Sequence, residues 1–102
     1  MMTTMASNEK LTVERVQTGF RMEKRLLKVL KAFADYKDLT LGDLMEGIVL
    51  HAFDGKSPFS QDSLERIREL KNFYGLELNS SASHNLVEAS RGWSAKKEKP
   101  MK

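Results

Sequence analysis

The segment Arg15-Val16-Gln17-Thr18-Gly19-Phe20-Arg21-Met22 leads directly into a helical pattern that covers residues 23–39. Its side chains alternate in character with a period of two, which is typical of a strand with one buried face. The face expected to be exposed carries Gln17, Gly19 and Arg21. The sequence therefore predicts a half-buried strand that runs straight into a helix.

A single strand leaves its backbone donors and acceptors unpaired, and no other part of the sequence alternates well enough to pair with this one. We therefore expect an intertwined homodimer with an intermolecular two-stranded antiparallel ribbon, formed by this strand and its copy. A ribbon of this kind fits the major groove of DNA. The predicted dimer core consists of Val16, Thr18, Phe20, Met22, Leu30, Leu44 and Ile48.

The remaining patterns are helical, so the predicted fold class is mostly α. In residues 23–39, apolar side chains recur at helical spacing, while Lys24, Lys28 and Lys31 share the opposite side. A second helix is expected between the N-cap Thr40 and Gly55, with Asp43 placed to complete a capping box.

Additional helices are expected on the C-terminal side of Pro58, which interrupts the helical pattern. Ser60 and Gly75 are the expected limits of the third helix, and residues 84–90 are suited to a short fourth helix. The chain then divides into a flexible N-terminal arm (1–10), a dimerisation and DNA-binding module (11–55), a C-terminal helical extension (56–90) and a disordered basic tail (91–102). We expect the extension to be separable from the module.

The order of these elements resembles the ribbon-helix-helix family of the Arc and MetJ type, over about residues 13–55. The resemblance rests on the strand followed by Glu23-Lys24-Arg25-Leu26-Leu27, and on Leu39-Thr40 followed by Leu44-Met45 and Ile48-Val49. It implies that Gln17, Gly19 and Arg21 contact bases in the major groove. Arginine and glutamine suit guanine and adenine, whereas Gly19 departs from the pattern because it has no side chain.

The resemblance also implies that the start of the second helix anchors a DNA phosphate through the amides near Thr40, Leu41 and Gly42. Asp43 and Glu46 lie close to this position in the sequence and oppose an anion. Further candidates for phosphate contacts are Lys24 and Lys28.

The net charge of +3 is unevenly distributed. Residues 10–37 carry eight basic and three acidic side chains, a net charge of +5, whereas residues 38–54 carry four acidic and no basic side chains. Clustered positive charge favours a nucleic-acid partner. The sequence has no cysteine, no apolar run long enough to span a membrane and no signal-peptide pattern in residues 1–9, so we expect a cytoplasmic protein.

Two classes of function remain open after these observations. The first is a dimeric, sequence-specific DNA-binding protein, most simply a transcriptional repressor. The second is an oligomerisation or protein-interaction module, such as an antitoxin-like or plasmid-maintenance component, in which residues 60–90 bind a partner protein. An enzyme is not expected, because His51 and His84 stand in no catalytic or metal-binding motif. We expect no cofactor and no metal.

Overall fold

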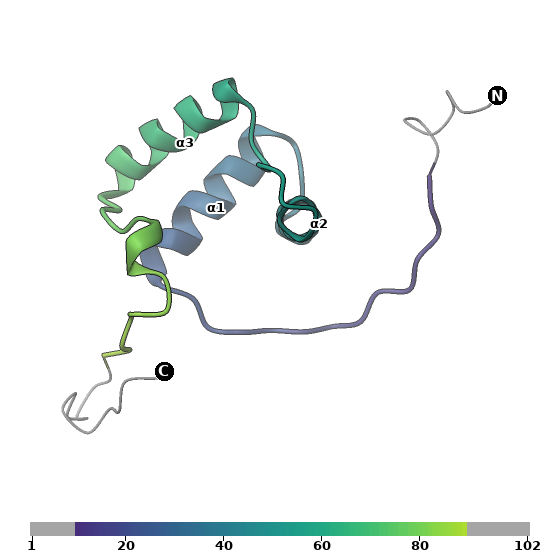
Figure 1. Ribbon diagram of the computed structural model, residues 1–102, viewed down its shortest axis with the longest axis horizontal. Helices are drawn as coiled ribbons and strands as arrows, with labels where there is room; N and C mark the ends of the chain where they lie inside the picture. The colour runs from purple at the N-terminus through teal and green to yellow at the C-terminus, as the bar shows by residue number, and fades with distance from the viewer. Residues whose placement is uncertain (1–9, 90–102) are drawn as a thin grey trace.

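Residues 10–89, which a computed structural model describes, contain three α-helices and one short 3-10 turn. Helix α1 spans Lys24–Tyr36, α2 spans Leu41–Phe53, α3 spans Gln61–Tyr74, and the turn η2 covers Ser80–Ala82. Figure 1 shows α1 and α3 side by side, with α2 crossing near the end of α1 and seen almost along its own axis.

Side chains cap all three helices at their N-termini. The Glu23 carboxylate accepts a hydrogen bond from the Leu26 amide at 2.8 Å, and the Thr40 hydroxyl accepts one from the Asp43 amide at 3.1 Å. The Ser60 hydroxyl does the same for Ser63. The predicted caps at Thr40 and Ser60 are thus confirmed, as is the end of α3 at Gly75, where a φ of 70° suits glycine.

The core lies between α1 and its two neighbouring helices. Its buried apolar residues are Val29, Phe33, Ala34, Leu44 and Leu76. Phe59, Ile67 and Leu70, all beyond Pro58, pack against the cluster of Phe33, Ala34 and Leu44. The Phe33 and Phe59 rings meet edge to face with centroids 5.5 Å apart. The C-terminal extension therefore shares the core of the module, and this packing does not support the expectation that the two are separable.

The prediction of a ribbon-helix-helix fold is wrong, because residues 10–89 contain no β-strand and therefore no β-ribbon. Residues 10–23, here called the lead segment, run as an extended chain beside the helices (Figure 1). The alternating pattern thus corresponds to extended backbone, but a strand also requires a hydrogen-bonded neighbour, and none of the described residues supplies one. The mostly helical part of the prediction is confirmed.

The short fourth helix expected at residues 84–90 is also not formed over the part of it that the structure describes. Residues 85–89 have no regular structure, and His84 has a φ of 68°, which no helix accommodates. The residues before His84 form the turn η2, in which the Asn79 side chain accepts a hydrogen bond from the Ser81 amide at 3.0 Å.

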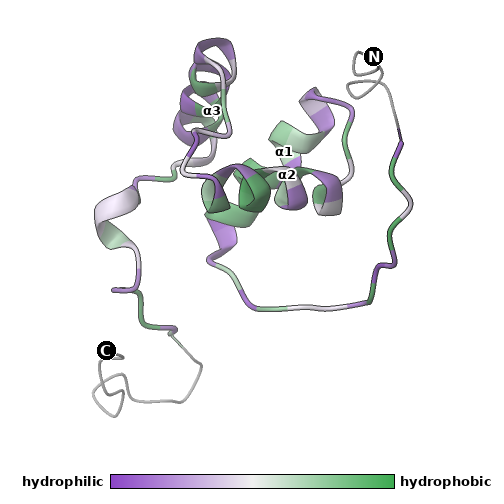
Figure 2. Ribbon diagram, turned by 45° about the vertical axis from the view of Figure 1, so that its right-hand side comes forward, coloured by the Kyte–Doolittle hydropathy of each residue, from purple (hydrophilic) through white to green (hydrophobic). Residues whose placement is uncertain are grey.

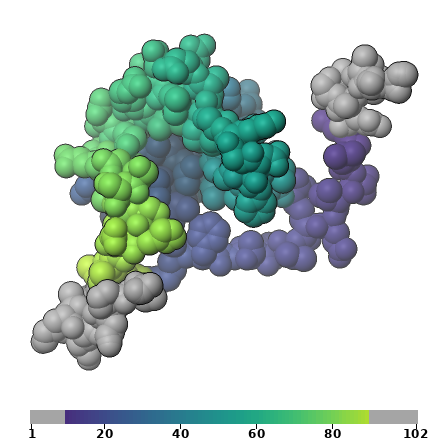
Figure 3. Space-filling model, viewed as in Figure 1, coloured from purple at the N-terminus to yellow at the C-terminus, as the bar shows by residue number. Residues whose placement is uncertain are grey.

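The lead segment contributes little to the core. Val16 is 78% exposed and Phe20 is 68% exposed. In the hydropathy colouring of Figure 2, apolar and polar residues alternate along it, and the space-filling view in Figure 3 shows it as a thin strip of chain along the rim of the helical body. The radius of gyration is 17.2 Å, against about 13 Å for a compact chain of about 100 residues. An exposed apolar edge therefore accompanies the helical core.

No helix within residues 10–89 has both the length and the apolar character needed to cross a membrane.

Candidate functional site

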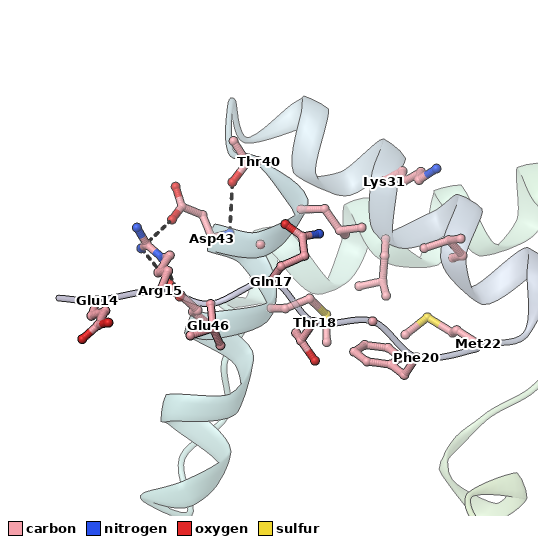
Figure 4. Close-up of a pocket in the computed structure, with 17 residues that line it drawn as sticks. Glu14, Arg15, Gln17, Thr18, Phe20, Met22, Lys31, Thr40, Asp43 and Glu46 are labelled. Carbon is pink, nitrogen blue, oxygen red and sulfur yellow. Dashed lines mark hydrogen bonds and ion pairs between the residues drawn. The ribbon is translucent and has the colours of Figure 1, made fainter.

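An open groove lies between the lead segment, the first half of α1 and the first turns of α2 (Figure 4). Its volume is about 1040 Å³. The lead segment supplies one wall, and the other wall is built from the two helices and the cap between them. The lining residues are Glu14, Arg15, Val16, Gln17, Thr18, Gly19, Phe20, Met22, Leu27, Leu30, Lys31, Thr40, Leu41, Gly42, Asp43, Met45 and Glu46.

This groove brings together two sets of residues that the sequence assigned to DNA. Gln17 and Gly19, expected to contact bases, line one wall, and Thr40, Leu41 and Gly42, expected to bind phosphate, line the other. A Cβ at Gly19 would meet no atom within 4 Å, so no contact within the described structure requires glycine there. The two sets therefore face a common space although some 20 residues separate them in the sequence.

Arg15 ties the lead segment to the start of α2. Its Nε and Nη2 atoms each donate a hydrogen bond of 2.8 Å to the carboxylate of Glu46, and Nη2 lies 3.6 Å from the carboxylate of Asp43. Figure 4 shows these contacts as dashed lines. A bidentate pair of this kind fixes direction as well as distance. The Arg15 guanidinium thus connects the two walls at this end of the groove.

Hydrogen bonding to Arg15 holds the pKa of Glu46 below its ordinary value. The same hydrogen bonds, with the charge of Glu46, raise the pKa of Arg15. All three members of this cluster are exposed, with side chains that are about half open to solvent. The cluster is therefore a positioning contact and contributes little to stability.

The pairing with Arg15 also changes the electrostatics at the start of α2. Asp43 and Glu46 were expected to oppose an anion there, but Arg15 offsets part of their charge. The amides of Leu41 and Gly42 precede the first helical hydrogen bond, and none of the described residues accepts a hydrogen bond from either. This helix terminus retains the free donors that an anion requires.

Arg21 lies outside the groove and contacts the C-terminal part of the chain. Its Nε atom donates a hydrogen bond of 3.0 Å to Oε1 of Glu88, and its Nη2 atom pairs with Oε2. Hydrogen bonding to Arg21 lowers the pKa of Glu88, and hydrogen bonding to Glu88 raises that of Arg21. The arginine expected to contact a base is thus held by an internal carboxylate.

The predicted phosphate contacts Lys24 and Lys28 are exposed on α1, four residues apart, and share one side of the helix. They line no part of the open groove, whereas Lys31 does. Of the three lysines that share this side of α1 in the sequence pattern, only Lys31 is at the wall of the groove.

The predicted dimer core divides into two groups. Leu44 is buried, and Leu30 and Ile48 pack against it. Val16, Thr18 and Phe20 are exposed, and Met22 is partly buried. Only the members on helices belong to the core of the single chain, and those of the lead segment line the open groove instead.

Sequence reasoning missed the acidic partners of both lead-segment arginines. Glu46 lies 31 residues from Arg15, and Glu88 lies 67 residues from Arg21. No local spacing rule reaches such distances, because only the packing of α2 and of the C-terminal segment brings these carboxylates to the lead segment. Sequence reasoning also missed buried Val29 and Leu76.

Comparison of the chain with protein-family models, with curated proteins and with solved structures gave no match. Among residues 10–89, no group of three or more histidine, aspartate or glutamate side chains is arranged to hold a metal ion.

Proposed function

We propose that this chain is a DNA-binding protein that acts as a homodimer in the cytoplasm and regulates transcription, with repression as the expected outcome. The observation that carries the proposal is the open groove, which presents Gln17 and Gly19 opposite the free amides at the start of α2. Base-reading and phosphate-binding groups on one surface are what recognition of duplex DNA requires. The β-ribbon is not part of this proposal.

The distribution of charge supports DNA as the ligand. The lead segment and α1 contain most of the positively charged side chains of residues 10–89, and the exposed Lys31 of α1 lines the groove. Exposed lysines that neutralise phosphates release counterions, and this release favours binding at low salt. Gly19 supports close approach of the DNA, because its missing side chain leaves open space.

Self-association is supported by the complementary character of the groove and the lead segment. The lead segment exposes Val16 and Phe20, and the apolar part of the groove consists of Leu27, Leu30 and Met45 from α1 and α2. In the proposed dimer, the partner copy covers this apolar part and leaves the polar rim of the groove to DNA. Each copy has both surfaces, so two copies related by a two-fold axis would cover the same apolar area on each other. The small buried core of the single chain gives such an association a further stabilising role.

The proposal is tested by selecting bound sequences from a pool of randomised DNA duplexes at low salt. We expect the parent chain to enrich a defined sequence. Arg21→Ala should weaken binding to that sequence about tenfold to a hundredfold per guanine contacted, because a bidentate base contact is lost. Failure of the parent chain to retain any duplex at low salt contradicts the proposal.

Arg68→Ala is the matched control, because it removes the same charge from an exposed position on α3, away from the groove. We expect it to leave the enriched sequence unchanged. Lys24→Ala and Lys28→Ala should reduce the salt dependence of binding without changing the sequence selected, as expected for phosphate contacts.

A second candidate, binding of a partner protein through residues 60–90, is favoured by one observation. Phe73 on α3 is 79% exposed and stacks edge to face on Tyr74. A separate hollow, which Phe73 does not line, is formed by residues that include Leu64, Ile67 and Leu76. If the duplex selection retains nothing while residues 60–90 bind a partner protein that Phe73→Asp releases, as expected for an antitoxin-like component, the second candidate replaces the first.

A further inference from the structure

The C-terminal segment crosses the start of α1 and reaches the lead segment. Arg25 Nη1 donates a hydrogen bond of 3.1 Å to the carbonyl oxygen of Gly75, and Leu76 is buried directly after it. Figure 1 shows the chain leaving α3, passing through η2 and descending beside the first residues of α1. The end of α3 is thereby fixed close to the point where the lead segment enters α1.

Glu88 is brought to Arg21 by this path. Both oxygens of its carboxylate face the guanidinium, in the same fork geometry by which arginine binds a phosphate or the edge of a guanine. The pair occupies Nε and Nη2, which form one of the two edges through which a guanidinium makes bidentate contacts. A carboxylate and a DNA acceptor therefore exclude each other at this edge.

The segment that holds Glu88 is suited to displacement. Residues 85–89 have no regular structure, and Leu86 and Val87 are about half exposed. The guanidinium and the carboxylate are themselves exposed. An exposed ion pair is weak, but its covalent attachment to the same chain gives Glu88 a high effective concentration at Arg21.

We propose that Glu88 acts as an internal competitor for DNA at Arg21, an inference that rests on the proposed function. In the free protein, Glu88 binds Arg21 and thereby lowers the affinity of the chain for DNA, whatever the DNA sequence. When DNA binds, its acceptor groups replace the carboxylate, and residues 85–89 leave the lead segment. The C-terminal segment thus sets the threshold at which the chain binds DNA.

The competition is tested with full-length variants by fluorescence anisotropy on a labelled duplex of mixed sequence at low salt. Glu88→Gln removes the charge of the competitor, so we expect it to bind the duplex several-fold more tightly than the parent chain. Glu77→Gln is the matched control, because Glu77 is exposed and pairs with no basic side chain among residues 10–89. Its smaller effect measures the change in net charge alone.

A double variant separates competition at Arg21 from general electrostatics. In an Arg21→Ala background, Glu88→Gln should tighten binding no more than Glu77→Gln does. If Glu88→Gln and Glu77→Gln tighten binding equally in the parent background, the competition is overturned.

The contact itself has a readout that does not need DNA. The NMR signal of the Arg21 Nε–H group should shift in Glu88→Gln and stay in place in Glu77→Gln. If no variant binds any duplex but the signal shifts as expected, the proposed function is overturned and the contact stands without a role in DNA binding. If the signal does not shift, the inference is overturned even where the parent chain binds DNA.

Discussion

At the scale of single residues, the two arginines of the lead segment are held by carboxylates from distant parts of the chain. Arg15 fixes the segment to α2 through Glu46, and the pKa of Glu46 is lowered by this contact. A carboxylate whose pKa is lower in the folded state stabilises its contact above its ordinary pKa, and the contact is lost as the pH falls through the lowered value. The groove should therefore open in acid.

We expect the amide NMR signals of residues 16–18 to move as the pH falls below 4.5, the ordinary pKa of glutamate. In Glu46→Gln at pH 7, these signals should have chemical shifts close to those of the parent chain at low pH, because the glutamine amide forms no ion pair with Arg15. The thermal melt should change little, since the cluster is exposed. Signals that titrate identically in the parent chain and in Glu46→Gln would show that Arg15 does not hold the segment.

At the scale of elements, the sequence predicted α1, α2 and α3, but it wrongly predicted a strand in the lead segment and a fourth helix after α3. The ends of α2 and α3 are set by Thr40, Ser60 and Gly75, whose caps act within a few residues and can therefore be predicted locally. The alternation of residues 15–22 could predict extended backbone, but pairing depends on a neighbour that no local pattern specifies. The same limit applies to the site: Gln17 and Thr40 could be proposed from the sequence, whereas the carboxylates of Glu46 and Glu88 could not.

The buried face of α1 shows how tertiary packing changes a local prediction. Periodicity identified an apolar side that includes Leu26 and Phe33, but Val29 is buried and Leu26 is 37% exposed. Because α3 packs against α1, the helix needs a second apolar contact face beside the one that meets α2. The face that α3 would cover could not be chosen before the position of α3 was known.

Helix α3 should be required for folding, since Phe59, Ile67 and Leu70 pack against the cluster that includes Phe33 and Leu44. We expect a chain that ends at residue 57 to lose the cooperative thermal unfolding of the full chain. The measurement is a thermal melt followed by the helical signal in circular dichroism. If the truncated chain unfolds cooperatively at the same temperature as the parent chain, the C-terminal extension is separable after all.

A milder change tests the same packing in the full-length chain. Leu76→Ala should lower the free energy of unfolding by about 2–4 kcal/mol, because it removes a buried side chain and leaves a cavity beside α1 and α3. Leu86→Ala is the matched control, since Leu86 is about half exposed and should change stability much less. Equal losses in the two variants would show that burial of Leu76 does not connect the extension to the core.

At the scale of the whole molecule, the single chain leaves a large apolar edge uncovered. Val16 and Phe20 are exposed beside the apolar part of a groove of about 1040 Å³, and covering both would remove apolar surface from water, which favours association. We therefore expect a dimer at micromolar concentration, with twice the 11.6 kDa mass of the chain in sedimentation equilibrium or light scattering.

Phe20→Asp should separate association from folding, because Phe20 is exposed in the single chain and its replacement leaves no buried charge. We expect this variant to be monomeric and to keep the helical circular dichroism of the parent chain. Phe73→Asp is the matched control: it makes the same substitution at an exposed site on α3, far from the groove, and should remain dimeric. A parent chain that sediments at 11.6 kDa throughout the micromolar range would contradict self-association.

Loss of helicity in Phe20→Asp would have a different meaning. A carboxylate unfolds the helices only where it is buried, so this result would show that Phe20 lies in a core formed by two chains.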